Sequence, residues 1–148
     1  MTTPSLKESN WDLVIDASNL CSLQCPKCIR SNIKKVPGET LTVDRFKKLI
    51  KYFNRSITFS GQISDPIMNP HLPTFLKILH EENIFSGIHT ASSYRNLDWY
   101  EIAYNNNRKT RWVFGLDGLP SESHLYRKNQ DGYKIFEAMK LGASKGMQ

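Results

Sequence analysis

Hydrophobic and polar positions along this chain of 148 residues alternate between two spacings. Four short runs rich in β-branched and aromatic residues, each bounded by Ser, Gly or Asn, predict β-strands at residues 12–17, 56–60, 84–90 and 111–117. Between these runs, apolar residues recur at the spacing of one helix face. The sequence therefore predicts strands and helices that follow one another in turn.

Each predicted helix has an apolar stripe, which we assign to the core rather than to a cofactor site. Thr42 is a suitable N-cap for the first helix, and Asp44 lies in its first turn. The stripes are Phe46, Leu49, Ile50 and Phe53; Leu72, Phe75, Leu76 and Leu79; Trp99, Ile102 and Ala103; and Ile135, Phe136 and Met139. Four strand–helix units predict an α/β fold with a parallel sheet and helices outside it.

Length and composition indicate one domain after a short leader. Residues 1–10 are polar and predict a flexible leader, and residues 11–148 supply the domain. The net charge of +6 comes partly from Lys and Arg clusters without interleaved aromatic residues. These clusters predict solvated surface rather than a nucleic-acid interface, and they leave an anionic partner open. No apolar run approaches the length of a membrane span, so no membrane partner is expected.

The residues that follow the four predicted strands are polar or rich in glycine. After the first strand comes a cysteine-rich stretch, followed at the later strand ends by "SGQISDP" (60–66), "ASS" (91–93) and "GLDGLP" (115–120). Ligands of parallel α/β sheets bind beyond the carboxyl ends of the strands. The four strand ends together therefore predict one shared binding site.

All three cysteines of the chain lie in one stretch, "SNLCSLQCPKCIRS" at 18–31. A helix would place Cys21, Cys25 and Cys28 on one face, but Pro26 cannot continue a helix, so we expect a loop. The odd number of cysteines and the lack of a signal peptide disfavour a disulfide scaffold. They favour a reducing, cytoplasmic environment.

Three chemical uses of these thiols stay open. Zinc would need a fourth ligand, but the four histidines lie far away in the sequence. A redox dithiol would use Cys25 and Cys28 and leave Cys21 surplus. An iron–sulfur cluster uses all three, because soft thiolates suit iron and three of them leave one iron of a four-iron cube free for a non-protein ligand. The sequence favours this last use.

The spacing C-x3-C-x2-C after a short apolar strand, in "WDLVIDASNLCSLQCPKC", resembles that of the radical S-adenosylmethionine (radical SAM) enzymes, over about residues 11–141. The resemblance implies a [4Fe-4S] cluster held by Cys21, Cys25 and Cys28, with S-adenosylmethionine (SAM) at the free iron. In such enzymes, reductive cleavage of SAM gives a 5′-deoxyadenosyl radical that abstracts hydrogen from a substrate, which this sequence does not identify. The resemblance also implies an electron donor such as a flavodoxin or ferredoxin.

Three later strand ends resemble family signatures in the family's order. "SGQISDP" resembles the segment whose backbone receives the amino group of SAM, and "HTASSYRN", "FGLDG" and "SESHLYRKN" resemble later parts of the site. The resemblance implies that SAM contacts Gly61, Gln62, Asp65, Pro66, Ser92, Asp117 and Arg127. Arg127 would pair with the SAM carboxylate. The structural alternatives are ordinary Gly/Pro turns, a helix N-cap pair at Ser92 and Ser93, and an exposed arginine.

The family's core usually has six βα units, and this sequence supplies four. The resemblance therefore implies a partial (β/α) barrel, the N-terminal two-thirds of a radical SAM core without its last strands. We expect a fragment or a shortened relative, with a sheet completed by another chain as the alternative. Besides an active enzyme, an inactive truncated relative and a non-enzymatic metal-binding or thiol redox module stay open as functions.

Overall fold

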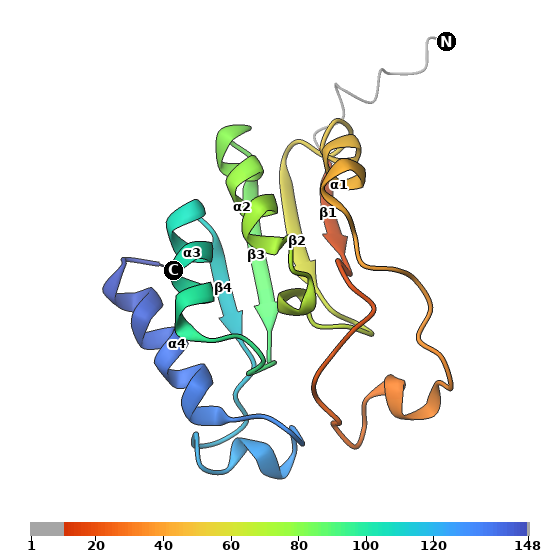
Figure 1. The fold of residues 1–148 in the computed structure, drawn as a ribbon, viewed down its shortest axis with the longest axis vertical. Helices are drawn as coiled ribbons and strands as arrows, with labels where there is room; N and C mark the ends of the chain where they lie inside the picture. Colours follow the sequence, from red (N-terminus) through yellow and green to blue (C-terminus); the bar gives the residue numbers. More distant parts are fainter. Residues whose placement is uncertain (1–10, 148) are drawn as a thin grey trace.

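The computed structural model describes residues 11–147, in which four parallel strands form one sheet (Figure 1). The strands lie in the sheet in chain order. They are β1 (Asp12–Ile15), β2 (Ser56–Ser60), β3 (Phe85–Thr90) and β4 (Arg111–Phe114). In register, Ser56 lies between Asp12 on one side and Phe85 on the other. The predicted α/β fold with a parallel sheet is confirmed, and the predicted leader lies outside the described residues.

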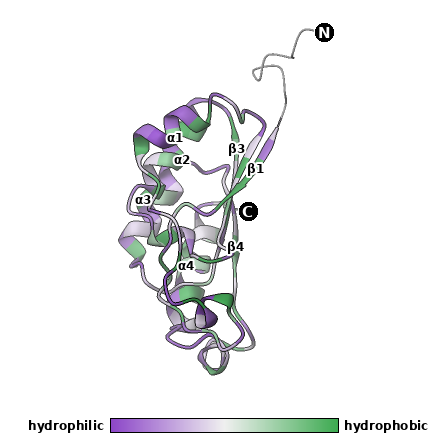
Figure 2. Ribbon diagram, turned by 90° about the vertical axis from the view of Figure 1, so that its right-hand side faces the viewer, coloured by the Kyte–Doolittle hydropathy of each residue, from purple (hydrophilic) through white to green (hydrophobic). Residues whose placement is uncertain are grey.

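The helices that connect the strands lie on one side of the sheet (Figure 2). The α-helices are α1 (Val43–Leu49), α2 (Leu72–Glu81), α3 (Leu97–Asn106) and α4 (Gly132–Ser144), and the short 3-10 turns are η2 (Ile29–Asn32), η3 (Pro66–Met68) and η4 (Ser123–Leu125). Within residues 11–147, no helix has the length and apolarity that crossing a membrane would require.

Side-chain caps set the starts of the helices. Thr42 accepts a hydrogen bond from Arg45 N at the start of α1, which confirms the predicted N-cap. At α3 the cap is Asn96, which accepts from Trp99 N at 3.0 Å. The alternative in which Ser92 and Ser93 cap this helix is therefore wrong, because the chain runs on for three residues before the helix begins.

Two aromatic clusters fill the space between the helices and the sheet. In the first, the rings of Phe46 and Phe75 stack with centroids 4.3 Å apart, next to Phe59 of β2. In the second, Tyr104 meets Trp112 edge to face at 5.1 Å. Such pairs contribute about 0.5–1.5 kcal/mol beyond their buried area. The core thus fastens both halves of the sheet to the helices above them.

Two of the predicted apolar stripes are wrong in part. Ile102 of α3 and Phe136 of α4 are 55% and 43% exposed. In their place, α3 buries Tyr100 and Tyr104, whose rings pack against Trp112 of β4. The Tyr104 hydroxyl donates to Ala138 O at 2.9 Å, so its polar atom is satisfied inside the core. Met139 is also exposed, whereas Ile135, Ala138 and Gly142 are buried with Gly132.

β1 and β4 end before the predicted residues 17 and 117 because side chains take over the backbone groups there. Ala17 O accepts from Asn69 Nδ2 at 2.7 Å, and Asn69 is fully buried. Gly115 O accepts from the side chain of Gln130. Backbone groups at the carboxyl edge of the sheet are therefore paired with loops rather than with a longer strand.

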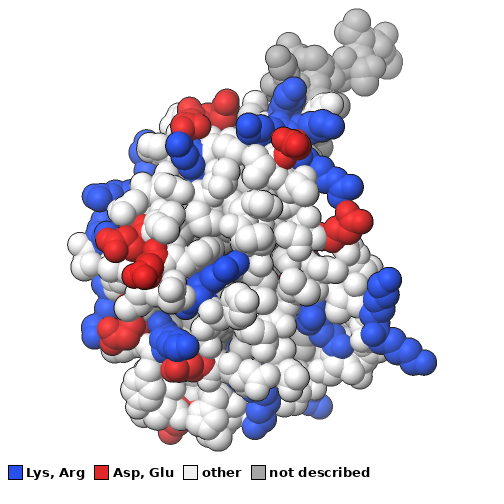
Figure 3. Space-filling view, in the orientation of Figure 1, with Lys and Arg blue, Asp and Glu red and all other residues white. Residues whose placement is uncertain are grey.

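Lys and Arg side chains are scattered among acidic and neutral ones on the face shown in Figure 3. Several of them form exposed ion pairs, such as Arg45 with Glu39 at 2.8 Å. Pairs of this kind contribute about 0–1 kcal/mol each. This arrangement agrees with the predicted solvated surface.

Candidate functional site

A cavity of about 270 Å³ opens at the carboxyl ends of the strands, where the sequence predicts a shared site. His89 and Val113 line it from the sheet face opposite the helices, because their neighbours Ile88 and Trp112 are buried in the core. The predicted site residues that also line it are Cys21, Cys25, Cys28, Gly61, Gln62, Asp65 and Arg127. The cavity therefore joins the end of β1 to the ends of all three other strands.

The cysteine stretch is a loop, as Pro26 predicts. Near its end Cys28 N donates to Cys25 O at 3.0 Å, and η2 begins directly after Cys28. Leu23 is only 9% exposed and anchors the middle of the loop in the protein. All three cysteines are free and half-buried.

Burial shifts the pKa of the two earlier thiols in the same direction. Burial raises the pKa of Cys21 above its ordinary value; a hydrogen bond from Leu23 N and the charge of Arg30 oppose this effect. Burial also raises the pKa of Cys25, and the charge of Arg127 opposes that. A metal that binds here must therefore displace protons from these thiols.

An iron–sulfur cluster needs several thiolate ligands around one space. Among residues 11–147, no three His, Cys, Asp or Glu side chains are already arranged to hold a metal ion. The three thiols nevertheless line one cavity, and soft thiolates are the ligands that iron–sulfur clusters use. The residues present thus fit such a group in their chemistry and share one cavity, and the thiols would have to move together to bind it.

Segments after β3 and β4 hold the cysteine loop in place. The hydroxyls of Ser22 and Ser92 lie 2.6 Å apart, and Gln24 N donates to Lys128 O at 3.1 Å. Asn129 Nδ2 donates to Ser22 O at 3.4 Å, and the backbone of Asn129 has a φ of 69°, a left-handed conformation that Asn tolerates well. The position of the loop therefore depends on residues about a hundred positions later.

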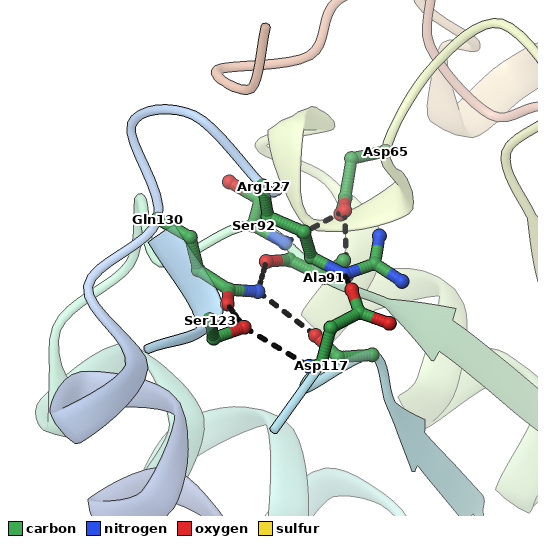
Figure 4. Close-up of polar contacts among 8 residues, drawn as sticks. Asp65, Ala91, Ser92, Asp117, Ser123, Arg127 and Gln130 are labelled. Atoms are coloured by element: carbon green, nitrogen blue, oxygen red, sulfur yellow. Dashed lines mark hydrogen bonds and ion pairs between the residues drawn. The ribbon is translucent and has the colours of Figure 1, made fainter. Parts of the chain in front are cut away.

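Asp65 ties the end of β2 to the end of β3. The side chain is buried, and its carboxylate accepts from Thr90 Oγ1 at 2.7 Å and from Ala91 N and Ser92 N at 2.9 Å each (Figure 4). It also accepts from Ile67 N and so caps η3. Burial raises the pKa of Asp65, and these hydrogen bonds oppose the rise. Because Asp65 joins η3 to residues 90–92, it anchors the cavity wall, and its contact with SAM stays a prediction.

Gly61 starts a turn that requires glycine. A Cβ atom at this position would lie 1.8 Å from Ser64 O. Asp16 fastens the turn, because its carboxylate accepts from Gln62 N at 3.1 Å and from Ser64 Oγ at 2.6 Å. Residues 60–65 all line the cavity, so their backbone is placed where a ligand can approach closely.

Three predicted site residues lie beside the cavity rather than on its surface. Pro66 is buried at the first position of η3, as in an ordinary capped turn. Ser92 is fully buried, and its hydroxyl accepts from Tyr94 N in addition to its contact with Ser22. Asp117 does not line the cavity and forms an ion pair with Arg127. These three residues support the wall, and their predicted contacts with SAM remain untested.

Arg127 reaches the cavity past Gly115. A Cβ atom at Gly115 would lie 3.0 Å from Arg127 Nη2, so glycine leaves room for the guanidinium. Arg127 Nε forms an ion pair with Asp117 Oδ2 without the angle of a hydrogen bond. The Arg127 side chain is only 24% exposed. The alternative of an exposed arginine is therefore wrong.

Sequence reasoning missed Gln130, which bridges the ends of β3 and β4. It is 5% exposed; its Nε2 donates to Ala91 O at 2.6 Å and to Gly115 O at 2.8 Å, and its Oε1 accepts from Ser123 Oγ (Figure 4). A glutamine just before a helix N-cap carries no signal of burial. Only the expectation that carbonyl groups at strand ends need donors would have pointed to it.

No protein-family model matches this sequence, and no curated protein does. Solved structures match it with 17–18% identity. SuiB of Streptococcus suis, bound to the precursor peptide SuiA, has a TM-score of 0.70 over 93% of this chain. Methylornithine synthase (PylB) has a TM-score of 0.66 over 92%, and anSMEcpe with bound AdoMet and the Cp18Cys peptide has 0.64 over 93%. All three are radical SAM enzymes.

This chain has the radical SAM fold. It spans 31% of SuiB, 40% of anSMEcpe and 42% of PylB, so it corresponds to part of each radical SAM enzyme. The predicted partial barrel, with its likeness to part of a radical SAM core, is confirmed as a fold.

Proposed function

We propose that this chain is the cofactor-binding part of a radical SAM enzyme. The observation that carries the proposal is that three thiols, the Gly61 turn and the Arg127 guanidinium line one cavity at the strand ends of a radical SAM fold. In this proposal Cys21, Cys25 and Cys28 hold a [4Fe-4S] cluster, and SAM occupies the rest of the cavity.

The chain's own residues would bind and orient SAM. Backbone carbonyls at Gly61 and Gln62 accept from its ammonium group, and Arg127 donates to its carboxylate in a charge-assisted bond. Asp65 forms part of the cavity wall, and Pro66, Ser92 and Asp117 support it from behind. When bound, the cluster supplies one electron to SAM, whose cleavage gives methionine and a 5′-deoxyadenosyl radical that takes a hydrogen atom from the substrate.

The proposed function implies an electron donor and a substrate as partners. The electron would come from a small redox protein, a flavodoxin or ferredoxin, in the cytoplasm. Two of the matching structures contain a peptide, which supports peptides as the first substrate class to test. The net charge of +6 favours anionic peptides among them.

Anaerobic reconstitution tests the cluster. We expect about four irons and four sulfides per chain and a broad visible absorbance that a reductant bleaches. A variant with alanine at Cys21, Cys25 and Cys28 should bind no iron, whereas Ser144→Ala, an exposed change at the end of α4, should bind as much as the wild type. Stoichiometric zinc without this absorbance would contradict the proposal.

Electron paramagnetic resonance tests the binding of SAM. Adding SAM should change the spectrum of the reduced cluster. The SAM concentration that gives half of this change measures SAM binding, and Arg127→Ala should weaken that binding by about 1.5–3 kcal/mol, the contribution of a charged hydrogen bond. Arg45→Ala removes an exposed arginine on α1 and serves as the matched control. A spectrum that saturating SAM leaves unchanged would exclude SAM at the free iron.

A thiol redox module is the second candidate. The hydrogen bond from Cys28 N to Cys25 O folds these two residues into one turn, which favours an intramolecular disulfide. Mild oxidation that joins Cys25 to Cys28 and leaves Cys21 free, in a chain that takes up no iron, would favour this candidate.

A further inference from the structure

Arg30, which the family resemblance does not involve, lines the same cavity as the three thiols. We propose that Arg30 closes the cysteine loop and supplies positive charge to the thiol site. This inference rests on the proposed function, because it concerns the same site. It assigns Arg30 as a positioning residue rather than a group that takes part in the chemistry.

The guanidinium of Arg30 connects three segments of the chain. η2 starts directly after Cys28 and so places Arg30 just beyond the last thiol. Arg30 Nη1 donates to Asn19 O at 2.9 Å, ahead of the first thiol, and also to Ile63 O in the turn after β2. One side chain therefore links the beginning of the loop, its end and the neighbouring strand end.

A backbone hydrogen bond lies next to this link. Asp65 N donates to Leu20 O at 2.8 Å, so the start of the loop is held by both residues 63 and 65. The planar guanidinium presents several donors in fixed directions, whereas a lysine ammonium is a compact charge at the end of a flexible stem. Arginine is thus the residue that suits a half-buried link between two carbonyl groups.

The charge of Arg30 is not neutralised by a carboxylate in the part of the chain that the structure describes. None of the ion pairs among residues 11–147 includes it, whereas Arg127 is paired with Asp117. Arg30 lines the same cavity as Cys21, so its positive charge lies at the thiol site. A cation beside thiolate ligands stabilises the more negative, reduced state of a bound cluster and so makes its midpoint potential more positive.

Hydrogen–deuterium exchange of the metal-free chain of residues 1–148 tests the closure of the loop. In Arg30→Gln we expect amides at 18–31 to exchange about tenfold faster, as loss of a hydrogen bond to a charged group implies. Peptides from β2 and β3 should exchange as in the wild type and show that the sheet is intact. Arg45→Gln, the same change at an exposed site, should leave the loop unchanged. Loop exchange in Arg30→Gln equal to that of the wild type would overturn the closure.

The midpoint potential of the reconstituted cluster tests the charge. Arg30→Gln should shift it to more negative values, and Arg30→Lys should restore it without restoring slow exchange of the loop. An unchanged potential in Arg30→Gln would overturn the electrostatic role. If the wild-type chain takes up no cluster, the proposed function fails, while the exchange measurement on the metal-free chain still decides whether Arg30 closes the loop.

Discussion

Replacing Gln130 by methionine tests whether one buried side chain holds the ends of β3 and β4 together. Gln130 donates to the carbonyl groups of Ala91 and Gly115 and accepts from the Ser123 hydroxyl. Methionine has a similar length and adapts to irregular spaces, but it forms only weak hydrogen bonds. The substitution therefore keeps most of the packing and removes all three hydrogen bonds.

The expected loss in the free energy of unfolding is about 3 kcal/mol, from three hydrogen bonds at about 1 kcal/mol each. Gln130→Glu should cost more than this. Its carboxylate would bring an oxygen against the two carbonyl oxygens that now accept from Nε2, so two attractive contacts would become repulsive.

Urea unfolding followed by circular dichroism measures the effect. With a slope of about 2 kcal/mol per molar, a loss of 3 kcal/mol lowers the midpoint by about 1.5 M. Gln24→Met makes the same chemical change at an exposed glutamine and should leave the midpoint where it is. A decrease below about 0.3 M in Gln130→Met would refute the bridging role, since that is less than one hydrogen bond.

Other changes test the cavity walls and the chain as a whole. In Gly61→Ala the new Cβ would lie 1.8 Å from Ser64 O, so the turn must move; we expect a loss of about 2 kcal/mol or more in urea unfolding, and an unchanged midpoint would contradict the tight turn. In Gly115→Ser the side chain would meet Arg127, and calorimetry should show SAM binding about tenfold weaker, as loss of one charged contact implies; equal affinity would speak against that contact. Residues 1–148 alone, with dithionite and SAM, should form little 5′-deoxyadenosine, because the chain covers 31–42% of its structural relatives; many turnovers would show that four βα units suffice.

The sequence predicted elements well where apolar side chains alone decide the packing. In α2, Leu72, Phe75 and Leu79 follow the helical spacing, and all are buried as predicted. In α3, the prediction counted Ile102 and passed over Tyr100, because a hydropathy pattern gives tyrosine little weight. In the structure Tyr100 is buried, and its ring packs in the second aromatic cluster against Trp112 and Phe114.

The residues of the candidate site also fall into those that the sequence predicted and those that it did not. Some site residues can be predicted from residue type alone, such as cysteines in one loop, a glycine at a strand end and a late arginine. The structure brings Cys21, Gly61 and Arg127 of this kind to one cavity. Gln130 and Arg30 act through backbone carbonyl groups. Which carbonyl groups lack a partner becomes clear only once the strands are paired, so no local pattern in the sequence reveals these two residues.

The contacts that hold the cysteine loop join residues that leave the ribosome far apart in time. Because the strands adjoin in chain order, each new strand can add to a sheet already formed as the chain leaves the ribosome. The thiols emerge early, but Asn129 follows its partner Ser22 by 107 residues. A cofactor delivered before that segment docks would meet thiols on a loop that is not yet held. If the chain carries the proposed cluster, loading belongs after β4 and the segment behind it have folded, and the folded chain is then the form that an assembly machinery would have to accept.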